Sequence, residues 1–396
     1  MTTYTILIIL SGLVIFSYLF DLVASKTKIP SVLLLLLLGI GLRFLVERLS
    51  IQPFNFLSIL PTLGTVGLIL IVFEGSLELK YDRNKNKIIK GAFFSALTVL
   101  LGTATIITVI IYQISHKDLY TCIANAIPFS VISSAIAIPS AAALGGKDKE
   151  FVVYESSFSD ILGIIIFNFA ITNHSLNTSA FIGLGLSTFL IILLSAIACV
   201  VLLYIMGRLV HHIKFFLIIS ILILVYAIGQ SYHLSSLVLI LSTGLFLNNA
   251  DTIQNVWFRS IFLYKNLAAD LSQLYQLSAE SAFILRTFFF VIFGFTMNVN
   301  ELNNLPIIAN GLFILASIYV IRLIFLKIFK KDSIAPILYI APRGLISILL
   351  YFNLPSSLKI PEVGTSFLFL VVLGSSLVMT LGIALSKRNA EEAPTV

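Results

Sequence analysis

Apolar runs separated by short polar segments occupy nearly the whole chain. A helix needs about 20 apolar residues to cross the hydrocarbon of a bilayer, and we predict thirteen such spans. They are 4–23, 30–48, 60–79, 91–113, 120–145, 151–173, 179–207, 213–230, 233–248, 280–298, 306–328, 334–356 and 364–386. Amphipathic runs of about ten residues, which are typical of membrane barrels, are absent from the sequence. The pattern predicts an all-α polytopic membrane protein.

Composition supports this interpretation. The 396 residues are 59% hydrophobic and 11% charged, and the mean hydropathy is +1.06, which is far outside the range of soluble domains. No basic segment precedes the first apolar run, so we expect a retained first helix rather than a cleaved signal peptide.

Basic residues are distributed unevenly between the two sides of the predicted bundle. Loops after odd-numbered spans, together with the adjoining span ends and the C-terminal tail, hold eighteen Lys and Arg, whereas the loops and adjoining span ends on the other side hold three. Because basic loops stay in the cytoplasm, we expect the N-terminus outside and the C-terminus inside, in a bacterial inner membrane. The net charge of +7 reflects this asymmetry, and no nucleic-acid partner is expected.

Several charged residues lie inside predicted spans. Three arginines lie deep in the apolar runs: Arg286, Arg322 and Arg343. An unpaired cation at such depth costs at least about 2.5–3.5 kcal/mol. The acids that can pair with them are Glu74, Glu155 and Asp160. We therefore expect buried ion pairs.

Two spans contain helix-breaking residues. In 120–145 the stretch SSAIAIPSAAALGG predicts a break near 135–140, and in 334–356 the stretch YIAPRGLISI predicts one near 341–344. Each break frees backbone carbonyls and amides at mid-membrane depth. Such openings are tolerated only where they face protein or a water-filled cavity.

The two breaks occupy matching places in the chain. Residues 91–173 and 306–386 each form a three-span unit with a broken middle span, and three spans precede each unit. The single span 179–207 links the halves. Because one span, an odd number, lies between them, the second half has the opposite orientation in the membrane. Two inverted six-helix repeats with crossed broken helices are the architecture of secondary transporters.

The stretch VVYESSFSDILGIIIFNF is nearly all apolar but carries two acids. Residues four apart lie on one helix face, so Ser156 and Asp160 share one stripe, and Glu155 and Ser159 share the next. One stripe can face an ion and the other an arginine. A carboxylate, a hydroxyl and unwound carbonyls suit a small monovalent cation, and the carboxylate can take a proton instead.

Other reactive patterns are absent from the sequence. It contains no phosphate-binding glycine loop, nucleophile elbow or zinc signature, and Cys122 and Cys199 lack metal or disulfide spacing. We expect no enzymatic activity, no cofactor and no metal beyond a transported cation.

The segment 251–280 is too polar to span, and we expect it to lie along the cytoplasmic interface as an amphipathic helix or helix pair.

At these residues the chain resembles the monovalent cation/proton antiporters of the NhaP and sodium/proton exchanger type. KIPSVLLLLLLGIGL resembles the family's second helix, LGTVGLILIVFEGSLEL its third, YESSFSDILG its sixth, and YVIRLIFL and APRGLIS its last helices. The resemblance covers essentially the whole chain. It implies a lipid-embedded homodimer in which a mobile core moves against dimerisation helices. The core would comprise 91–173 and 306–386, the scaffold 1–90 and 179–305, and the tail 387–396.

The resemblance implies roles for single residues. Asp160 matches the family's ion- and proton-binding aspartate, Ser156 its hydroxyl ligand, and Glu74 an acid that assists ion binding in some members. Glu155 matches a structural acid that pairs with an arginine of the last core helices. That arginine is Arg322 or Arg343, and Arg286 is a further buried charge.

Two positions depart from the family pattern. Ser159 precedes Asp160 where members often have Asn or Asp, and Ala137-Ile138-Pro139 stands where members have Thr-Asp-Pro. The second acid is therefore lost, although the Ala137 carbonyl and Ser159 remain candidate ligands. These departures bear on ion preference and on the exchange cycle.

The sequence thus predicts an antiporter that exchanges Na⁺, K⁺ or Li⁺ for protons by alternating access, electroneutral at one for one, with Asp160 as the shared site. One alternative is a sodium-coupled symporter of an organic anion, against which Ile138 and the apolar ILGIIIF argue. Another is a non-transporting receptor. Asp160 has its own alternative, as a structural acid paired with Arg343 or Arg286.

Overall fold

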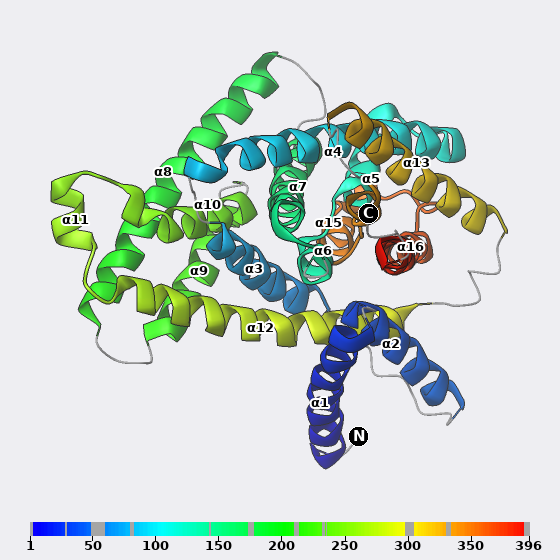
Figure 1. The fold of residues 1–396 in the computed structure, drawn as a ribbon, viewed down its shortest axis with the longest axis horizontal. Coiled ribbons are helices and arrows are strands. Elements are labelled where there is room, and N and C mark those ends of the chain that lie inside the picture. Colours follow the sequence, from blue (N-terminus) through cyan, green and yellow to red (C-terminus); the bar gives the residue numbers. More distant parts are fainter. Residues whose placement is uncertain are drawn as a thin grey trace. The chain divides into compact units, whose positions relative to one another are not determined.

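The computed structural model describes residues 3–27, 30–48, 60–79, 83–141, 144–172, 178–209, 214–231, 234, 236–297, 305–329 and 334–391. Within these ranges the secondary structure is helical, with no strand (Figure 1). The α-helices are α1 Thr3–Thr27, α2 Ser31–Arg48, α3 Leu60–Glu78, α4 Asn86–Ser115, α5 Leu119–Ser130, α6 Ser134–Ala141, α7 Gly146–Thr172, α8 Thr178–Arg208, α9 Lys214–Ser231, α10 Ser236–Asn248, α11 Val256–Phe262, α12 Leu267–Thr296, α13 Leu305–Phe329, α14 Ala335–Tyr339, α15 Leu345–Phe352 and α16 Thr365–Glu391. Short 3₁₀ turns are η2 Arg83–Lys85, η3 Ala250–Thr252 and η5 Ser356–Leu358.

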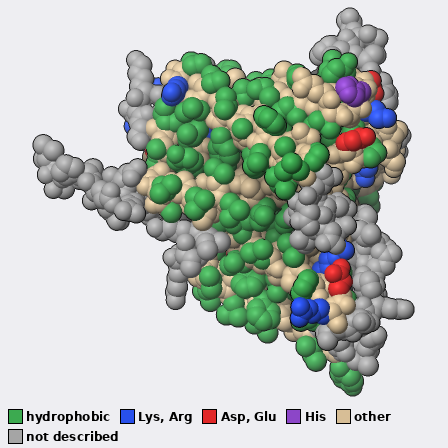
Figure 2. Space-filling view, turned by 90° about the vertical axis from the view of Figure 1, so that its right-hand side faces the viewer, with side chains coloured by type: hydrophobic (Ala, Val, Ile, Leu, Met, Phe, Trp, Pro, Cys, Tyr) green, Lys and Arg blue, Asp and Glu red, His purple; other side chains and the backbone are tan. Residues whose placement is uncertain are grey.

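Six helical segments in the described part of the chain are long and apolar enough to cross a membrane. They are Asn86–Ser115, Leu119–Ala141, Thr188–Arg208, Leu267–Thr296, Leu305–Ile328 and Thr365–Ser386. Figure 2 shows a face covered largely by hydrophobic side chains, and α8 and α13 expose large residues such as Phe189 and Phe313. Apolar side chains turned outward fit a lipid environment. The all-α membrane fold is confirmed, whereas the number of thirteen crossings stays a prediction.

Every predicted span contains a helix, but some boundaries differ. Residues 267–280, which we expected in a separate interfacial helix or helix pair, form the first half of the long helix α12. The rest of the segment 251–280 holds the end of η3 and the short α11. α16 continues to Glu391, into the predicted tail, and residues 392–396 lie outside the described part.

The first break differs from the prediction near 135–140. The chain is extended at Val131 and leaves the helix over residues 131–133, while Pro139 lies inside α6. Two β-branched residues, Val131 and Ile132, occupy the break and favour extended backbone. Gly163 of α7 admits this segment, because a Cβ there would lie 2.4 Å from Val131 Cγ2. The second break lies at residues 340–344, where the chain is not helical; the prediction placed it near 341–344.

α5 begins with a side-chain cap. The carboxylate of Asp118 accepts from the Thr121 N–H at 2.9 Å and from the Thr121 hydroxyl at 2.8 Å, which satisfies donors that a helix start leaves open. These two bonds hold the pKa of the Asp118 carboxyl below its usual range.

The chain forms two compact units. The first unit comprises Met1–Pro61, Lys87–Gly163 and Arg286–Val396, and the second comprises Thr62–Asn86 and Ile164–Leu285. In the first unit α13 packs on α16, and α15 packs on α5. In the second, α10 packs on α8 and α9. α1 and α2 belong to the same unit as the helices of the predicted core, and the division into a moving core and a scaffold stays a prediction.

Candidate functional site: two broken helices around Asp160

The polar site of the first unit lies where the two helix breaks meet. The Ser133 N–H donates to the Pro342 carbonyl over 2.9 Å, so one break satisfies a backbone donor of the other. The Ile132 N–H donates to Ser159 Oγ on α7 at 2.9 Å. Both amides would be orphaned without these partners, and buried amides must be paired. The extended segment is thus held from two sides.

Arg343 fills the centre of this crossing without an acid partner among the described residues. Its Nε donates to the Phe129 carbonyl at 2.8 Å and one Nη to the Ser130 carbonyl at 3.2 Å. The other Nη donates to the Ala341 carbonyl at 3.0 Å, and its backbone N–H donates to Ser375 Oγ at 2.9 Å. The Phe129 and Ser130 carbonyls end α5, where the helix dipole is negative. Arg343, which is fully buried, therefore caps the half-helix.

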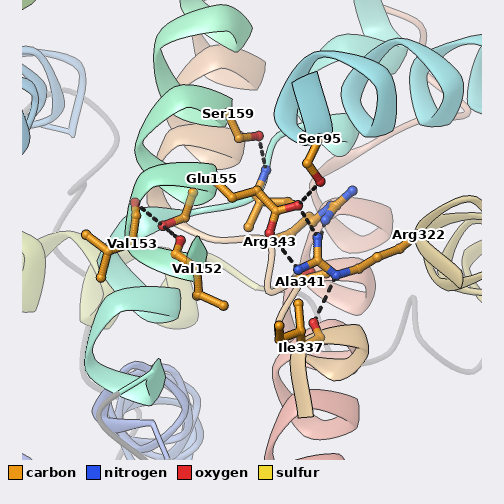
Figure 3. A network of polar contacts seen from close by, with 11 residues as sticks. Ser95, Val152, Val153, Glu155, Ser159, Arg322, Ile337, Ala341 and Arg343 are labelled. Atoms are coloured by element: carbon orange, nitrogen blue, oxygen red, sulfur yellow. Dashed lines mark hydrogen bonds and ion pairs between the residues drawn. The ribbon is translucent and has the colours of Figure 1, made fainter. Parts of the chain in front are cut away.

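Arg322 and Glu155 form a buried ion pair (Figure 3). Two guanidinium nitrogens donate to the two carboxylate oxygens at 2.9 and 2.7 Å. Ser95 Oγ donates to the carboxylate at 2.5 Å, and Arg322 Nε donates to the Ile337 carbonyl at 3.1 Å. Of the two arginines considered from the sequence, Arg322 is thus the one paired with Glu155. A bidentate pair with these further bonds is the geometry that a buried salt bridge needs.

Asp160 is held differently. It lies on α7 with 9% of its surface exposed, and one carboxylate oxygen accepts from the Ser134 N–H at 3.1 Å. Because Ser134 is the first residue of α6, the carboxylate lies at the positive end of that half-helix dipole. The other oxygen, Oδ1, is buried and has no hydrogen-bond partner. An ionised oxygen in this condition is costly unless a cation or a proton reaches it.

The remaining predicted ligands lie in different situations. Ser156 donates its hydroxyl proton to the carbonyls of Val152 at 2.8 Å and Val153 at 3.2 Å. Only the lone pairs of its hydroxyl oxygen therefore remain available to bind a cation. Ser159 supports the first break, as described above. Ala137 lies inside α6, and its N–H donates to the Ser133 carbonyl at 3.0 Å, so the carbonyl of Ala137 is not in the break itself.

Arg286 bonds to a carbonyl that a proline leaves open. Pro139 has no N–H, so the Ala135 carbonyl four residues earlier lacks its helical donor. Arg286 of α12, which is half-buried, donates to that carbonyl over 3.4 Å. Ala135 directly follows Ser134, whose amide binds Asp160. The arginine needs an acceptor, and here a backbone oxygen supplies it.

Glu74 lies on α3 in the second unit, where it is half-buried. Its action together with Asp160 stays a prediction.

Four residues of the site were missed in the sequence: Ser95, Ser133, Ser134 and Ser375. Serine is common in membrane helices and carries no periodic signal. Ser133 and Ser134 had one usable signal, since serine favours the residue just before a helix, and α6 begins at Ser134. Recognising that start would have moved the predicted break to 131–133.

The arrangement offers one unpaired carboxylate oxygen, hydroxyl oxygens and backbone dipoles. The described residues contain no group of three or more His, Cys, Asp or Glu side chains that would hold a resident metal ion. Oxygen ligands with a single negative charge suit one monovalent cation or one proton.

Two solved structures of a sodium proton antiporter, MjNhaP1 from Methanocaldococcus jannaschii, are similar to this chain. The structure at pH 8 has a TM-score of 0.71 at 20% identity and covers 98% of this chain and 100% of that chain. The second, from an electron microscopy map, has a TM-score of 0.67 at 20% identity and covers 99% and 97%. At this identity the likeness concerns the fold. No curated protein matches the chain closely enough to count as a relative.

A family model provides the assignment. The model of the transmembrane sodium/hydrogen exchanger matches residues 11–387, which is nearly the whole chain and includes both helix breaks, Glu155 and Asp160. The resemblance predicted from the sequence is confirmed, and the chain belongs to the sodium/hydrogen exchanger family.

Proposed function

We propose that the protein is a secondary antiporter that exchanges a monovalent cation for protons, with Asp160 as the shared binding site. The observation that carries the proposal is the Asp160 carboxylate, which is buried at the start of α6 with one oxygen bonded to Ser134 and the other without a partner. A bound cation or a proton offsets the cost of this buried negative charge, and the two compete for the same carboxylate.

The competition gives the exchange its coupling. A proton neutralises Asp160 on one side of the membrane and is displaced by a cation on the other, so the site crosses occupied in both directions. Ser156 and the Ala137 carbonyl are proposed as further oxygen ligands, with Ser159 holding the break. Glu74 assists ion binding. No enzymatic step and no cofactor enter the cycle.

The surroundings belong to the same proposal. We place the protein in a bacterial inner membrane with its N-terminus outside, as a homodimer in lipid. Residues 91–173 and 306–386 move against the remaining helices. Na⁺, K⁺ and Li⁺ all remain candidate substrates.

The test uses purified protein in proteoliposomes that contain a pH-sensitive dye. A pulse of Na⁺, K⁺ or Li⁺ should move protons in wild type, and Asp160→Asn should abolish that movement, because an amide neither takes a proton nor neutralises a cation. Glu362→Gln, which removes an exposed carboxylate, is the control and should transport normally.

The outcomes separate the candidate functions. Cation-dependent proton flux that survives in Asp160→Asn would remove Asp160 from the mechanism. Flux that requires an added organic anion would indicate the symporter, and wild-type protein that moves no ions under any gradient would indicate the receptor.

A further inference from the structure

We propose that a cavity in the second unit binds a phospholipid whose headgroup carries both a phosphate and a primary ammonium. The cavity has a volume of about 430 Å³ and lies at the end of α3, where the end of α10 and the first turns of α12 also line it. Its apolar wall includes Leu77, Leu263, Leu267 and Leu271. Ligand sites typically have this size and combine an apolar wall with a few polar groups that orient the ligand.

Two opposite charges line the cavity. They are Lys265 and Asp251, both exposed, and no other charged residue of the described chain lines it. Lys265 has no ion-pair partner among the described residues. Asp251 would repel a purely anionic headgroup, and Lys265 would repel a purely cationic one. A phosphate linked to an ammonium suits both side chains, because each can then form a charge-assisted hydrogen bond.

The walls of the cavity are fixed by bonds between different elements. Asn248 Nδ2 of α10 donates to the Leu77 carbonyl of α3 at 2.7 Å. The Tyr264 hydroxyl donates to the Asp270 carboxylate in the first turn of α12. Tyr264 also packs on α8, where a Cβ at Gly207 would lie 3.1 Å from its ring. The site is therefore formed before a ligand enters, and the acid of Asp270 is already engaged.

The helix next to the cavity is suited to the headgroup region of a membrane. α11 has no buried residue, and it exposes 82% of Val256, 66% of Trp257 and 49% of Ile261. Arg259 on the same helix is exposed as well. Tryptophan and basic residues beside exposed apolar ones are typical of segments that lie in the membrane interface. In that position the neighbouring cavity opens at headgroup depth, and its apolar wall can receive the start of an acyl chain.

The single tryptophan of the chain provides the measurement. The Trp257 ring contacts the Phe262 ring edge to face with centroids 6.1 Å apart, and Phe262 directly precedes Leu263 of the cavity wall. Lipids with brominated acyl chains quench tryptophan fluorescence at short range. Purified full-length protein is placed in phosphatidylcholine nanodiscs that contain a small, varied fraction of brominated phosphatidylethanolamine. Brominated phosphatidylcholine, which lacks N–H donors, measures the contribution of the surrounding bilayer.

We expect phosphatidylethanolamine to quench Trp257 at a fraction on the order of tenfold lower than phosphatidylcholine. Lys265→Gln and Asp251→Asn should each remove most of this preference. Lys359→Gln and Glu362→Gln, which remove exposed charges in the first unit, are the matched controls and should keep it. Soluble phosphoethanolamine should not displace the brominated lipid at equal concentration, because it lacks the acyl chains that the apolar wall receives.

The possible results separate the occupants, and none depends on antiport activity. Equal quenching by the two lipids in wild type would overturn the proposal, whether or not the variants fold. Brominated phosphatidylglycerol as effective as phosphatidylethanolamine would indicate a site for anions alone, and displacement by soluble phosphoethanolamine would indicate a site for the free headgroup. Either result would contradict a zwitterionic lipid site. Trp257 that no brominated lipid quenches would place α11 outside the membrane interface and would favour a protein contact, such as a second copy of the chain, in place of lipid.

Discussion

Three buried ionisable side chains at the crossing are stabilised in three different ways. Glu155 has a guanidinium on both carboxylate oxygens, and Arg343 has backbone carbonyls. Asp160 accepts from the Ser134 amide and leaves its other carboxylate oxygen without a hydrogen-bond partner. A buried charge with a complete set of partners stabilises the framework, whereas a buried carboxylate with an unpaired oxygen can bind a cation or a proton. At the scale of residues, this difference supports our proposal that Glu155 and Arg343 hold the framework and that Asp160 binds the transported ion.

The first prediction at this scale concerns stability. Glu155→Ala leaves Arg322 buried without its counter-ion, and breaking a buried pair costs about 3–5 kcal/mol. Asp160→Asn keeps an acceptor for the Ser134 amide and removes a buried charge. Thermal unfolding in detergent should therefore show a clearly lower Tm for Glu155→Ala and a Tm near wild type for Asp160→Asn.

Exchanging the charges of Glu155 and each candidate arginine identifies which arginine pairs with Glu155. Glu155→Arg combined with Arg322→Glu should recover part of the lost Tm, whereas Glu155→Arg combined with Arg343→Glu should not, since Arg343 serves backbone carbonyls. Equal melting temperatures for Glu155→Ala and Asp160→Asn would show that the two roles are assigned wrongly.

At the scale of elements, the broken helices are built from tertiary bonds more than from local signals. The break at 340–344 was predictable because Pro342 and Gly344 lie in it. The break at 131–133 contains neither proline nor glycine, and its amides depend on Ser159 and Pro342. Such partners come from distant parts of the sequence, so a local pattern cannot reveal them.

The Pro139 error has the same origin. Proline usually ends a helix because it leaves a carbonyl unpaired, and the prediction followed that rule. Arg286, distant in sequence, bonds the carbonyl and lets α6 continue. By contrast, Glu155, Asp160 and the buried arginines were found from sequence, because ionisable residues in apolar runs are conspicuous. The neutral serines around them were not.

The second prediction follows at this scale and concerns Arg286. Arg286→Leu leaves the Ala135 carbonyl without a donor, which costs about 1–3 kcal/mol for a buried group. Pro139→Ala restores the helical N–H to that carbonyl, so the same change of Arg286 should lower the Tm less in the Pro139→Ala background. A double-mutant cycle on melting temperatures measures the coupling.

Pro128 provides the matched control for this cycle. It is a second proline inside a half-helix, on α5. Pro128→Ala adds an N–H on α5, whereas Arg286 bonds the Ala135 carbonyl on α6. The loss of Tm caused by Arg286→Leu should therefore be the same in the wild-type and Pro128→Ala backgrounds. A coupling equal for both prolines would rule out the specific bond between Arg286 and the Ala135 carbonyl.

At the scale of the whole molecule, the question is how much charge each cycle moves. The first unit contains two helix breaks and Asp160, the proposed transport carboxylate, and Ile138 stands where the family resemblance implies a second acid. Glu155 is paired with Arg322 through both carboxylate oxygens, so its charge is balanced within the framework. In the proposed cycle Asp160 carries either one proton or one monovalent cation, and we therefore expect the same charge to cross in both directions.

The last prediction is that exchange is one for one and electroneutral. Proteoliposomes with fixed ion gradients and the membrane potential clamped at several values should give a reversal point that does not move with voltage, because no net charge crosses per cycle. Liposomes that contain the Asp160→Asn variant serve as the control, because they measure the background ion leak at each voltage. A reversal point that shifts with voltage would contradict the assignment and would point to a second titrating acid. Glu74, half-buried on α3, is then the residue to neutralise, and Glu74→Gln should remove the voltage dependence if its proton is the additional charge.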